Sequence, residues 1–346
     1  MGLLKNRPMA EPDCESLGTM IGKSAAMRTV FERTLRIAAS DSTVLITGES
    51  GTGKELIART IHDRSRRAGQ PFVAVNCGAI PEDLLENELF GHVRGAFTGA
   101  QQSRSGRFMT AKEGTIFLDE ISETTPRLQA KLLRVLQERE FNPLGSDIAT
   151  RTKARFVAAT NRDLREAIPA GEFREDLYYR LAILSLELPP LRARREDIPP
   201  LVEHFLERLS GRHRRTIDEA AMERLQTYDW PGNVREMENV IERIVTLTDH
   251  PVIHLDDLPE LLGYIRPEIR DALLHEFTLP SDGIDIDLCI QRFQRDMMVQ
   301  ALERAHDNKT LAASLLGLNR TTFIERLRRH GLGSLVPRRL VTPNGD

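Results

Sequence analysis

The sequence predicts an α/β domain built on a parallel sheet, followed by a small helical domain and a C-terminal all-α unit. Three observations support this prediction. Short apolar runs alternate with helical patterns in the first half of the chain, strand-like runs end near residue 190, and helical patterns continue alone after that point. A chain of 346 residues is long enough for two or three domains that each bury a core.

The apolar runs are continuous rather than alternating, which is typical of strands buried on both faces of a parallel sheet. They cover residues 43–48, 71–76, 114–120, 154–161 and 183–189. Intervening stretches such as 54–64 and 127–140 carry helical spacing, which completes a β–α alternation. We therefore expect the sheet domain over residues 19–190, after an irregular leader at 1–18.

Helical patterns without strands follow the sheet domain. The segments 198–209, 217–228 and 233–247 are amphipathic at helical spacing, which predicts a small helical domain over 191–262. Residues 263–286 contain Pro and Gly and are expected to form a linker. A third, all-helical domain is expected over 287–346.

Composition describes an ordinary globular protein. Charged residues make up 29% of the chain, hydrophobic residues 40%, and the net charge is -3, so a basic surface for nucleic acid has to be local. The three cysteines are scattered without metal-ligand spacing, which favours a reducing compartment. The sequence has no apolar run of about 18 residues and no signal peptide at its start, so we expect a cytoplasmic protein without a membrane partner.

A glycine-rich loop joins the first predicted strand to the next helix. The stretch "TVLITGESGTGKE" places the pattern G-x-x-x-x-G-K between a strand and a helix, where backbone N–H groups and the helix N-terminus can bind phosphate. Lys54 supplies a point charge for the β- and γ-phosphates, and Glu55 stands where Ser or Thr would offer a hydroxyl to Mg²⁺. A purely structural turn is the alternative. The expected nucleotide contacts are Gly48, Glu49, Ser50, Gly51, Thr52, Gly53, Lys54 and Glu55.

A pair of acids ends the strand "GTIFLDE". Asp119 can hold Mg²⁺ and Glu120 can polarise a water for attack on the γ-phosphate. Two acids that cap the next helix are the alternative, which the upstream loop disfavours. The sequence therefore predicts hydrolysis of a nucleoside triphosphate.

With these motifs in this order, the chain resembles the AAA+ ATPases and, more closely, the sigma-54-dependent transcriptional activators, also called bacterial enhancer-binding proteins. The resemblance covers residues 18–332. It rests on "GESGTGKE", "ELFGHVRGAFTGA", "GTIFLDE", "AATNRDL", "FREDLYYRL", "PPLRARREDI" and "WPGNVREMEN". The family shares the Glu after the lysine, so Glu55 matches it. The resemblance implies an ATP- and Mg²⁺-dependent hydrolase that assembles from dimers into a ring, expected to be a hexamer.

The resemblance assigns roles to further polar residues. Asn161 matches the sensor of the γ-phosphate, although a strand-end amide can also cap a helix. Asn76 matches the residue that holds Glu120 and releases it when partner contact changes. Arg235 matches a second sensor that links closure of the helical domain to nucleotide state. Two residues match the adenine-side contact or else pack in the core, Ile21 and Gly22.

Arg174 and Arg180 match the arginine fingers, which reach the ATP of a neighbouring subunit. An arginine supplied in trans stabilises transition-state charge and makes hydrolysis depend on assembly. From the residues alone, pairing of the two arginines with Glu175 and Asp176 is the alternative.

The loop "GAFTGA" separates this family from other AAA+ proteins. Its residues are Gly95, Ala96, Phe97, Thr98, Gly99 and Ala100. We expect the loop to interrupt a helix-like insertion and to project from the ring, with Phe97 as an apolar anchor and Thr98 as a hydroxyl for a partner's backbone. By resemblance the partner is sigma-54 within the RNA polymerase holoenzyme. A second pore loop is expected near 122–127. The sequence of segment 141–156 matches the family's usual pattern less closely than the other motifs do.

The C-terminal segment 308–332 predicts a helix-turn-helix, with Gly317 in the turn. Residues 308–339 contain seven basic residues and one acid, which favours DNA, although a solvated basic helix end is the alternative. The segment resembles the Fis-type DNA-binding domain, and a preceding helix over 288–305 would dimerise it on a palindromic site. The expected DNA contacts are Asn319, Arg320, Thr321, Thr322, Arg326 and Arg329.

The expected function is an activator that couples ATP hydrolysis in a ring to promoter opening by sigma-54 RNA polymerase, while bound to double-stranded enhancer DNA. Two alternatives remain: an AAA+ protein that remodels a different client, and a DNA-binding regulator that only binds nucleotide. About 18 residues precede the ATPase domain, so no regulatory domain is expected there. Three explanations of how the activator is controlled stay open: a separate protein acts on the ring, expression is regulated, or this chain is part of a longer one.

Overall fold

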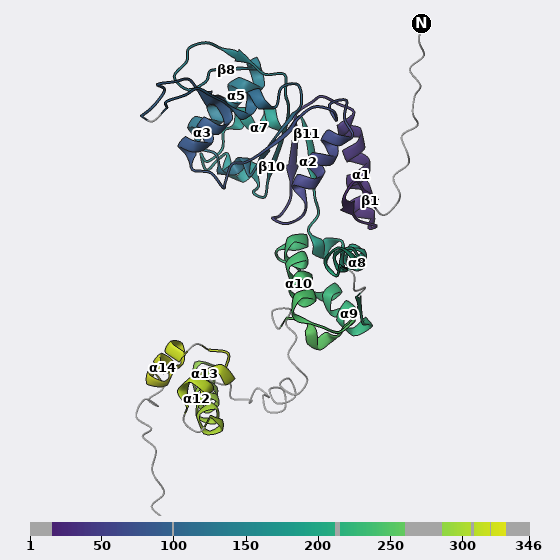
Figure 1. Cartoon of the computed structure of the whole chain (residues 1–346), viewed down its shortest axis with the longest axis vertical. Helices are drawn as coiled ribbons and strands as arrows, with labels where there is room; N and C mark the ends of the chain where they lie inside the picture. The colour runs from purple at the N-terminus through teal and green to yellow at the C-terminus, as the bar shows by residue number, and fades with distance from the viewer. Residues whose placement is uncertain are drawn as a thin grey trace, which may run out of the picture. The chain divides into compact units, whose positions relative to one another are not determined.

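The computed structural model describes residues 16–98, 100–211, 215–259, 286–305, 308–318 and 320–329 (Figure 1). The chain divides into two compact units, Met1–Tyr264 and Ile265–Asp346. The first unit contains a sheet domain and a helical lid, and the described residues of the second form three helices.

The sheet has five parallel strands in the order β11-β3-β10-β7-β4. Their bounds are β3 Val44–Thr47, β4 Phe72–Asn76, β7 Thr115–Asp119, β10 Arg155–Thr160 and β11 Leu184–Glu187. All five predicted strands and their parallel direction are confirmed. Strand β10 is buried along its whole length, as expected for the centre of a sheet with helices on both faces. Pairing of Asn76 with Asp119 and of Thr47 with Thr160 brings the carboxyl ends of the strands to one edge.

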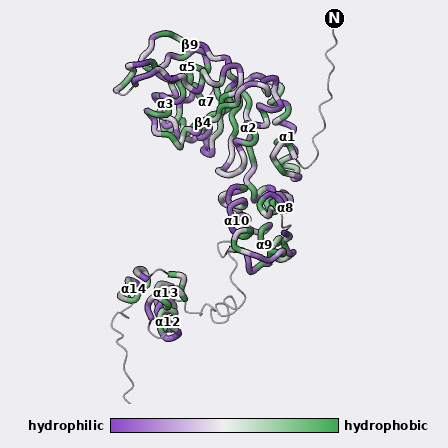
Figure 2. Tube along the Cα trace, in the orientation of Figure 1, coloured by the Kyte–Doolittle hydropathy of each residue, from purple (hydrophilic) through white to green (hydrophobic). Residues whose placement is uncertain are grey.

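Helices cover both faces of this sheet. On one face α1 (Ala25–Ala38) and α2 (Lys54–Asp63) pack against the strands, and on the other lie α3 (Glu82–Phe90), α5 (Pro126–Glu138) and α7 (Glu175–Leu181). Figure 2 shows apolar residues concentrated along the central strands between these helices. The remaining short elements of this domain are β1 Ser16–Leu17, β2 Met20–Ile21, β5 Gly91–His92, β6 Arg104–Ser105, α4 Arg107–Thr110, η1 Ile121–Glu123, β8 Glu140–Phe141, β9 Thr150–Arg151 and α6 Leu164–Ala167.

Strand β1 lies within the predicted leader. Ser16 and Leu17 pair with β2, and Leu17 is buried in the core against α1 and α2. The sheet domain therefore includes Ser16 and Leu17, which precede its expected start at residue 19. Residues 1–15 lie outside the described residues.

The described part of the lid contains three α-helices around Trp230. Helices α8 (Ile198–Leu209), α9 (Glu219–Thr227) and α10 (Asn233–Leu247) confirm the three amphipathic patterns. The Trp230 side chain is fully buried, and its indole N–H donates to the Leu225 carbonyl at 2.8 Å. Single-turn 3₁₀ helices complete the lid: η2 Leu191–Ala193, η3 Arg195–Asp197 and η4 Leu255–Asp257.

The expectation that the lid lacks strands is wrong in one detail. Strands β12 (Thr216–Ile217) and β13 (Val252–Ile253) pair in parallel beside α9. Each strand has two residues, and a strand this short shows no hydrophobic period in the sequence.

The second unit is a helix-turn-helix preceded by a long helix. Helix α12 (Ile286–Arg304) packs on α13 (Lys309–Leu315), and α14 (Arg320–Arg329) follows. Phe323 and Leu327 of α14 are buried together with alanines of α12 and α13, and Gly317 adopts φ 64° in the turn. The Asn308 side chain caps α13 by accepting from Thr310 and Leu311. The helix-turn-helix prediction is confirmed, whereas most of the predicted linker lies in residues 260–285, outside the described residues.

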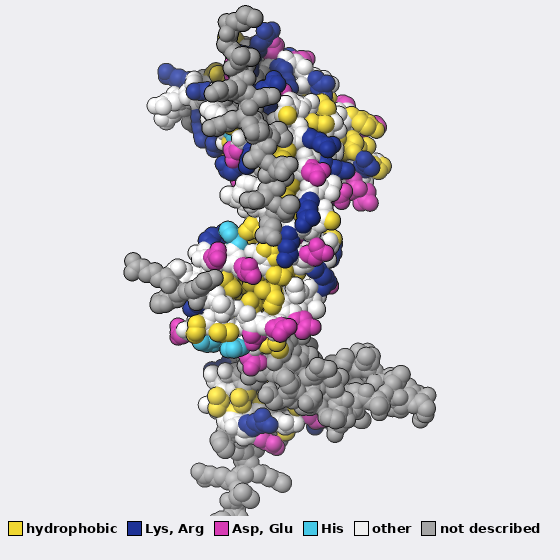
Figure 3. All heavy atoms as spheres, turned by 90° about the vertical axis from the view of Figure 1, so that its right-hand side faces the viewer, with side chains coloured by type: hydrophobic (Ala, Val, Ile, Leu, Met, Phe, Trp, Pro, Cys, Tyr) yellow, Lys and Arg dark blue, Asp and Glu magenta, His cyan; other side chains and the backbone are white. Residues whose placement is uncertain are grey.

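Charges of both signs mix on the surface of the first unit, as the face drawn in Figure 3 shows. This distribution agrees with the small net charge of -3. Among the helices that the structure describes, none combines the length and the apolar character that a membrane span requires.

Candidate ATPase site

The predicted P-loop, residues 48–55, connects β3 to α2 at the edge where the strands end. Gly51 adopts φ 77°, and a Cβ at this position would lie 2.2 Å from the Gly232 carbonyl oxygen of the lid. Only glycine satisfies both the left-handed backbone and this close approach. Thr52 is buried, and its hydroxyl donates to the Glu49 carbonyl at 2.8 Å.

Lys54 lies at the centre of this loop. Its ammonium group donates to the carbonyl oxygens of Gly48 at 2.7 Å and Glu49 at 3.0 Å. Burial lowers the pKa of Lys54, and the nearby charges of Asp119 and Glu120 oppose that shift. The structure therefore brings the predicted cation and the two predicted acids into electrostatic contact.

The two acids have different surroundings. Asp119 ends β7, and its carboxylate accepts from the backbone N–H of Glu120 at 3.0 Å. Glu120 adopts φ 54°, a left-handed conformation that is uncommon outside glycine and that concentrates at functional sites. A Cβ at Gly78 would lie 2.2 Å from Glu120 Oε2, so the Glu120 carboxylate packs on the Gly78 backbone.

Asn76 shapes the turn against which Glu120 packs. Its side-chain oxygen accepts from the backbone N–H groups of Gly78 at 2.9 Å and Ala79 at 3.0 Å. The expected hydrogen bond between Asn76 and Glu120 is not formed between these two described side chains. Asn76 instead holds the turn that contains Gly78, against which Glu120 packs, and sequence reasoning missed this contact.

Asn161 and the two predicted fingers are surface residues. Asn161 follows β10 and, with Thr47, Gly48 and Glu49, lines a hollow of about 460 Å³. Arg174 precedes α7 and donates to both carboxylate oxygens of Asp176, at 3.0 and 2.7 Å, which is the local pairing considered as the alternative. Arg180 is exposed and has no hydrogen-bond or ion-pair partner among the described residues.

The lid contacts the outer side of the P-loop. The Arg235 guanidinium donates to the Ser50 hydroxyl at 3.2 Å, and the backbone N–H groups of Val234 and Arg235 point at the Gly51 carbonyl oxygen at 3.0 and 3.4 Å. The structure therefore brings the predicted sensor Arg235 to the loop.

Asn233 is a second lid contact that sequence reasoning missed. Its side chain is fully buried at φ 52°. The amide nitrogen donates to Ser50 O at 3.0 Å and to Glu49 Oε2 at 3.1 Å, and the amide oxygen accepts from Leu191 N at 2.8 Å. An asparagine followed by a helix pattern was visible in the sequence, but it does not reveal a partner 184 residues away.

Charged residues of "PPLRARREDI" complete this junction. Arg192 binds Glu49 with both guanidinium arms, at 2.8 and 2.5 Å, and these bonds lower the pKa of Glu49 to about 2. The buried Arg194 donates to the Thr52 carbonyl at 3.1 Å. Sequence reasoning used this motif only as a family marker, because five of its ten residues are charged and the segment itself does not indicate which of them are paired or buried.

Asp197 joins the lid to the start of α1. Its carboxylate accepts from the backbone N–H groups of Lys23 and Ser24, both at 2.7 Å, and from the Ser24 hydroxyl at 2.8 Å. Gly22 is buried beside this contact, and Ile21 packs against the lid core. The predicted adenine-side pair therefore lies at the seam between the sheet domain and the lid.

The GAFTGA loop is carried by a two-stranded antiparallel ribbon, β5 and β6. The expectation of a helix-like insertion is therefore corrected. Gly91 allows the ribbon, because a Cβ there would lie 2.4 Å from the Arg104 carbonyl oxygen. The Gly95 N–H donates to Ala100 O at 2.9 Å and closes the loop, while Gly99 lies outside the described residues.

Phe97 is presented at the surface of this loop. Its side chain is 47% exposed, and its ring makes an edge contact with His92 at 5.0 Å between centroids. The His92 ring nitrogens are hydrogen-bonded to Asn87 Oδ1 and Gln102 O, which fixes the ring under Phe97.

In segment 122–127, where a second pore loop is expected, Ser122 and Thr124 are buried, and the Thr160 hydroxyl donates to Ser122 Oγ at 3.1 Å. The loop between β8 and β9 packs against the GAFTGA ribbon, with Leu144 N donating to Gly91 O at 2.9 Å. The segment that read as loose in the sequence thus supports the ribbon.

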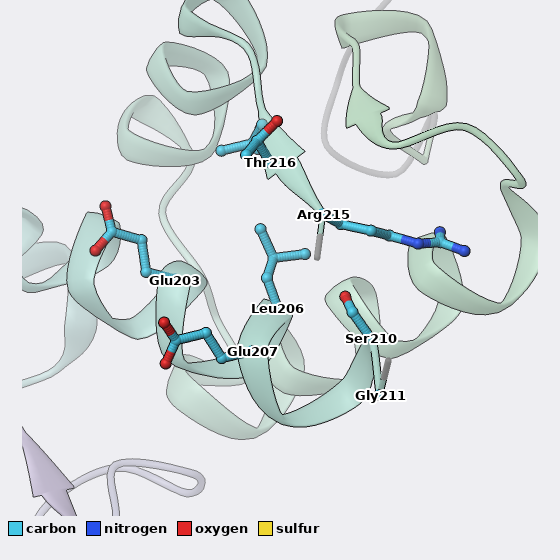
Figure 4. A pocket seen from close by; sticks show the side chains of 8 residues that line it. Glu203, Leu206, Glu207, Ser210, Gly211, Arg215 and Thr216 are labelled. Carbon is cyan, nitrogen blue, oxygen red and sulfur yellow. The ribbon is translucent and has the colours of Figure 1, made fainter. Parts of the chain in front are cut away.

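The lid contains a further hollow of about 560 Å³ between α8 and β12, drawn in Figure 4. Its lining includes Leu206, Glu203, Glu207 and Arg215, and it shares no residue with the P-loop.

In the second unit, the described part of the predicted DNA face lies on α14. Arg320 and Arg326 are exposed, and Thr322 is half-buried. Asn319 lies outside the described residues, as do the side chains of Thr321 and Arg329.

The fold and the P-loop with its lid define an AAA+ ATPase joined to a helix-turn-helix. Comparison with known families agrees: residues 20–187 match the Sigma-54 interaction domain, 192–272 the AAA+ ATPase lid domain, and 290–330 the Fis family of bacterial regulatory proteins. The chain belongs to the family of sigma-54-dependent transcriptional activators.

Similar proteins support this assignment. The regulatory protein AtoC of Escherichia coli K12 is 47% identical over 321 residues, covering 91% of this chain and 68% of AtoC. The DNA-binding transcriptional regulator NtrC of Azospirillum brasilense is 44% identical over 331 residues, covering 89% of this chain and 69% of NtrC. The crystal structure of NtrX from Brucella abortus in complex with ATP has a TM-score of 0.67 and 33% identity, and the match covers 91% of this chain and 69% of NtrX.

Proposed function

We propose that this chain opens promoters held by sigma-54 RNA polymerase, with ATP hydrolysis in a ring of identical subunits as the energy source. One arrangement in the first unit carries the proposal. Lys54, Asp119 and Glu120 meet at one edge of the sheet with Arg235 of the lid nearby, while the same domain presents Phe97 on the GAFTGA loop.

In this proposal the loop amides and Lys54 hold the phosphates of ATP. Asp119 would hold Mg²⁺, which supplies charge neutralisation between the β- and γ-phosphates. The donor set fits this ion, because Mg²⁺ usually takes one or two carboxylates and completes its shell with waters and phosphates. No group of three or more His, Cys, Asp or Glu in the described part of the chain forms a protein-only metal site. Glu55 has no hydroxyl to offer, and its exposed carboxylate lies 3.6 Å from the Arg59 guanidinium.

Glu120 is positioned to accept a proton from the attacking water. Its left-handed backbone and its packing on Gly78 fix the carboxylate, whose negative charge favours the charged form of Lys54. Asn161, at the rim of the neighbouring hollow, is placed to detect the γ-phosphate, and Asn76 sets the turn behind Glu120.

The arginine fingers require a neighbouring subunit. Arg180 is exposed without a local partner among the described residues, which suits a guanidinium that reaches another subunit's ATP. Arg174 would first exchange its bonds to Asp176. Hydrolysis then depends on ring assembly, for which a hexamer is the family's expected number.

The GAFTGA loop is the proposed contact with sigma-54. The Phe97 ring packs against the His92 ring, which gives the loop a defined resting conformation. Nucleotide-driven movement can raise the loop from this conformation. Thr98 is exposed next to Phe97 and offers a hydroxyl to the partner's backbone.

The second unit binds enhancer DNA in this proposal. Exposed Arg320 and Arg326 suit contacts from α14 to the major groove or its phosphates, together with the neighbouring predicted residues. Dimerisation through α12 would present two such helices to a palindromic site. The polymerase and the DNA place this activity in the cytoplasm, where a regulatory protein can act on the ring.

Promoter melting tests the proposal. Purified full chain, sigma-54 holoenzyme and a supercoiled template carrying a sigma-54 promoter are mixed with ATP, and single-stranded DNA is detected by permanganate. We expect melting with ATP, none with a non-hydrolysable analogue, and no effect on a promoter of a different sigma factor. ATP hydrolysis without melting and without sigma-54 binding would overturn the proposal and favour a different client.

A further inference from the structure

One ion pair connects the P-loop directly to the lid. Glu49 is the second residue of the P-loop, and Arg192 lies in η2, where the chain leaves the sheet domain. The Arg192 Nη1 and Nη2 atoms bind the two Glu49 oxygens at 2.8 and 2.5 Å. This fork-to-fork geometry fixes both distance and orientation, because the guanidinium and the carboxylate are planar.

The same carboxylate also binds a second segment of the lid. Asn233, at the first turn of α10, donates to Glu49 Oε2 at 3.1 Å, and its amide oxygen accepts from Leu191 N next to Arg192. Glu49 therefore joins the lid's entry segment and its helix α10. Arg235 follows Asn233 by two residues, and its guanidinium already reaches Ser50.

A carboxylate in a phosphate-binding loop weakens nucleotide binding, because its negative charge repels phosphate. The Glu49 side chain accepts hydrogen bonds from two lid groups, Arg192 and Asn233. Its chemistry is therefore suited to holding the lid and not to holding the nucleotide.

We propose that Glu49, paired with Arg192, is a positioning residue that docks the lid on the P-loop and thereby places Arg235 beside the phosphates of ATP. This inference rests on the role proposed above for Arg235. Glu49→Gln keeps the loop's glycines and amides and removes one negative charge. We expect KM for ATP to stay constant or fall, because phosphate repulsion is reduced, while kcat falls about tenfold, the effect of one partly exposed charge-assisted bond.

A mutant cycle with Arg235 is the test. ATPase kinetics of the full chain are measured for Glu49→Gln, Arg192→Gln, Arg235→Ala and the doubles of each glutamine variant with Arg235→Ala. If Glu49 acts through Arg235, Glu49→Gln lowers kcat in the wild-type background and has no further effect after Arg235→Ala. Arg192→Gln should behave in the same way.

A matched control is available in the lid. The pair Arg208–Glu238 has side-chain exposures of 45% and 40%, against 44% and 40% for Arg192–Glu49, but it joins α8 to α10 within the lid. Glu238→Gln should leave kcat and KM unchanged. Trp230 fluorescence of Glu49→Gln equal to that of wild type under the assay conditions would exclude misfolding as the cause of a kcat loss.

Three results separate the outcomes. If Glu49→Gln lowers kcat by the same factor with and without Arg235, or raises KM alone, Glu49 does not act by placing Arg235. If Arg235→Ala lowers kcat but Glu49→Gln does not, this inference fails and the proposed role of Arg235 stands. If Arg235→Ala leaves kcat unchanged, the proposed role of Arg235 fails as well.

Discussion

Asn233 offers a quantitative test of the junction between P-loop and lid. The residue is fully buried in a left-handed conformation at φ 52°, and its side chain bonds Leu191 N, Ser50 O and the Glu49 carboxylate. Asn233→Ala removes all three bonds and leaves the buried Leu191 N–H unpaired, which costs about 2–3 kcal/mol. An alanine in the left-handed region adds about 1–2 kcal/mol. The expected loss in the lid's free energy of unfolding is therefore about 3–5 kcal/mol.

A second variant separates the two contributions. Asn233→Gly loses the same hydrogen bonds but adopts the left-handed backbone without strain, so it should be about 1 kcal/mol more stable than Asn233→Ala. Trp230 is the only tryptophan of the chain and is fully buried in the lid core, so its fluorescence reports lid unfolding in urea. The reasoning is refuted if Asn233→Ala costs less than about 1 kcal/mol or if the glycine variant is the less stable of the two.

Three further predictions concern single buried or paired groups. The buried Arg155 guanidinium donates to the carbonyls of α1's last turn at 2.8 Å and 3.4 Å. Arg155→Met removes these bonds, which costs about 3 kcal/mol, and should therefore lower the melting midpoint of the first unit by about 6–12 °C. An unchanged midpoint in calorimetry contradicts this. Cys77 is buried with its pKa raised to about 12, so with Cys14 and Cys289 replaced by serine the native chain should resist thiol labelling at pH 8 and react when unfolded; rapid native labelling would rule out this burial. The Glu49 pKa is depressed from 4.5 to about 2, so its contribution to lid docking is complete above pH 4.5 and disappears as pH falls toward about 2. Glu49→Gln should then flatten the acid limb of stability against pH, and two parallel curves would refute this.

The sequence predicted the elements that have a period or a fixed spacing. The five continuous apolar runs identified the strands, but only the inner strands β3, β7 and β10 are buried on both faces, whereas the edge strands β4 and β11 expose alternate residues. The loop at 48–55 was identified by its spacing between a strand and a helix, and the structure places its lysine near Asp119 and Glu120.

Contacts that depend on distant parts of the chain could not be predicted. The Glu49–Arg192 pair joins residues 143 positions apart, and each residue alone reads as an ordinary surface charge. The GAFTGA ribbon depends on the close approach of Gly91 to Arg104, which a two-residue strand does not signal. The role of Gly78 against Glu120 likewise appears only when the turn after β4 is folded.

The coupling of ATP hydrolysis to promoter opening is the central claim, and the variant Thr98→Ala tests it most directly. ATPase rate and open-complex formation at a sigma-54 promoter are measured in the same samples for wild type, Thr98→Ala and Thr29→Ala, a control at an exposed threonine of α1. The account predicts that Thr98→Ala hydrolyses ATP but opens no DNA, whereas Thr29→Ala does both. Normal promoter opening by Thr98→Ala would contradict the proposal that the GAFTGA loop transmits the energy of ATP to sigma-54.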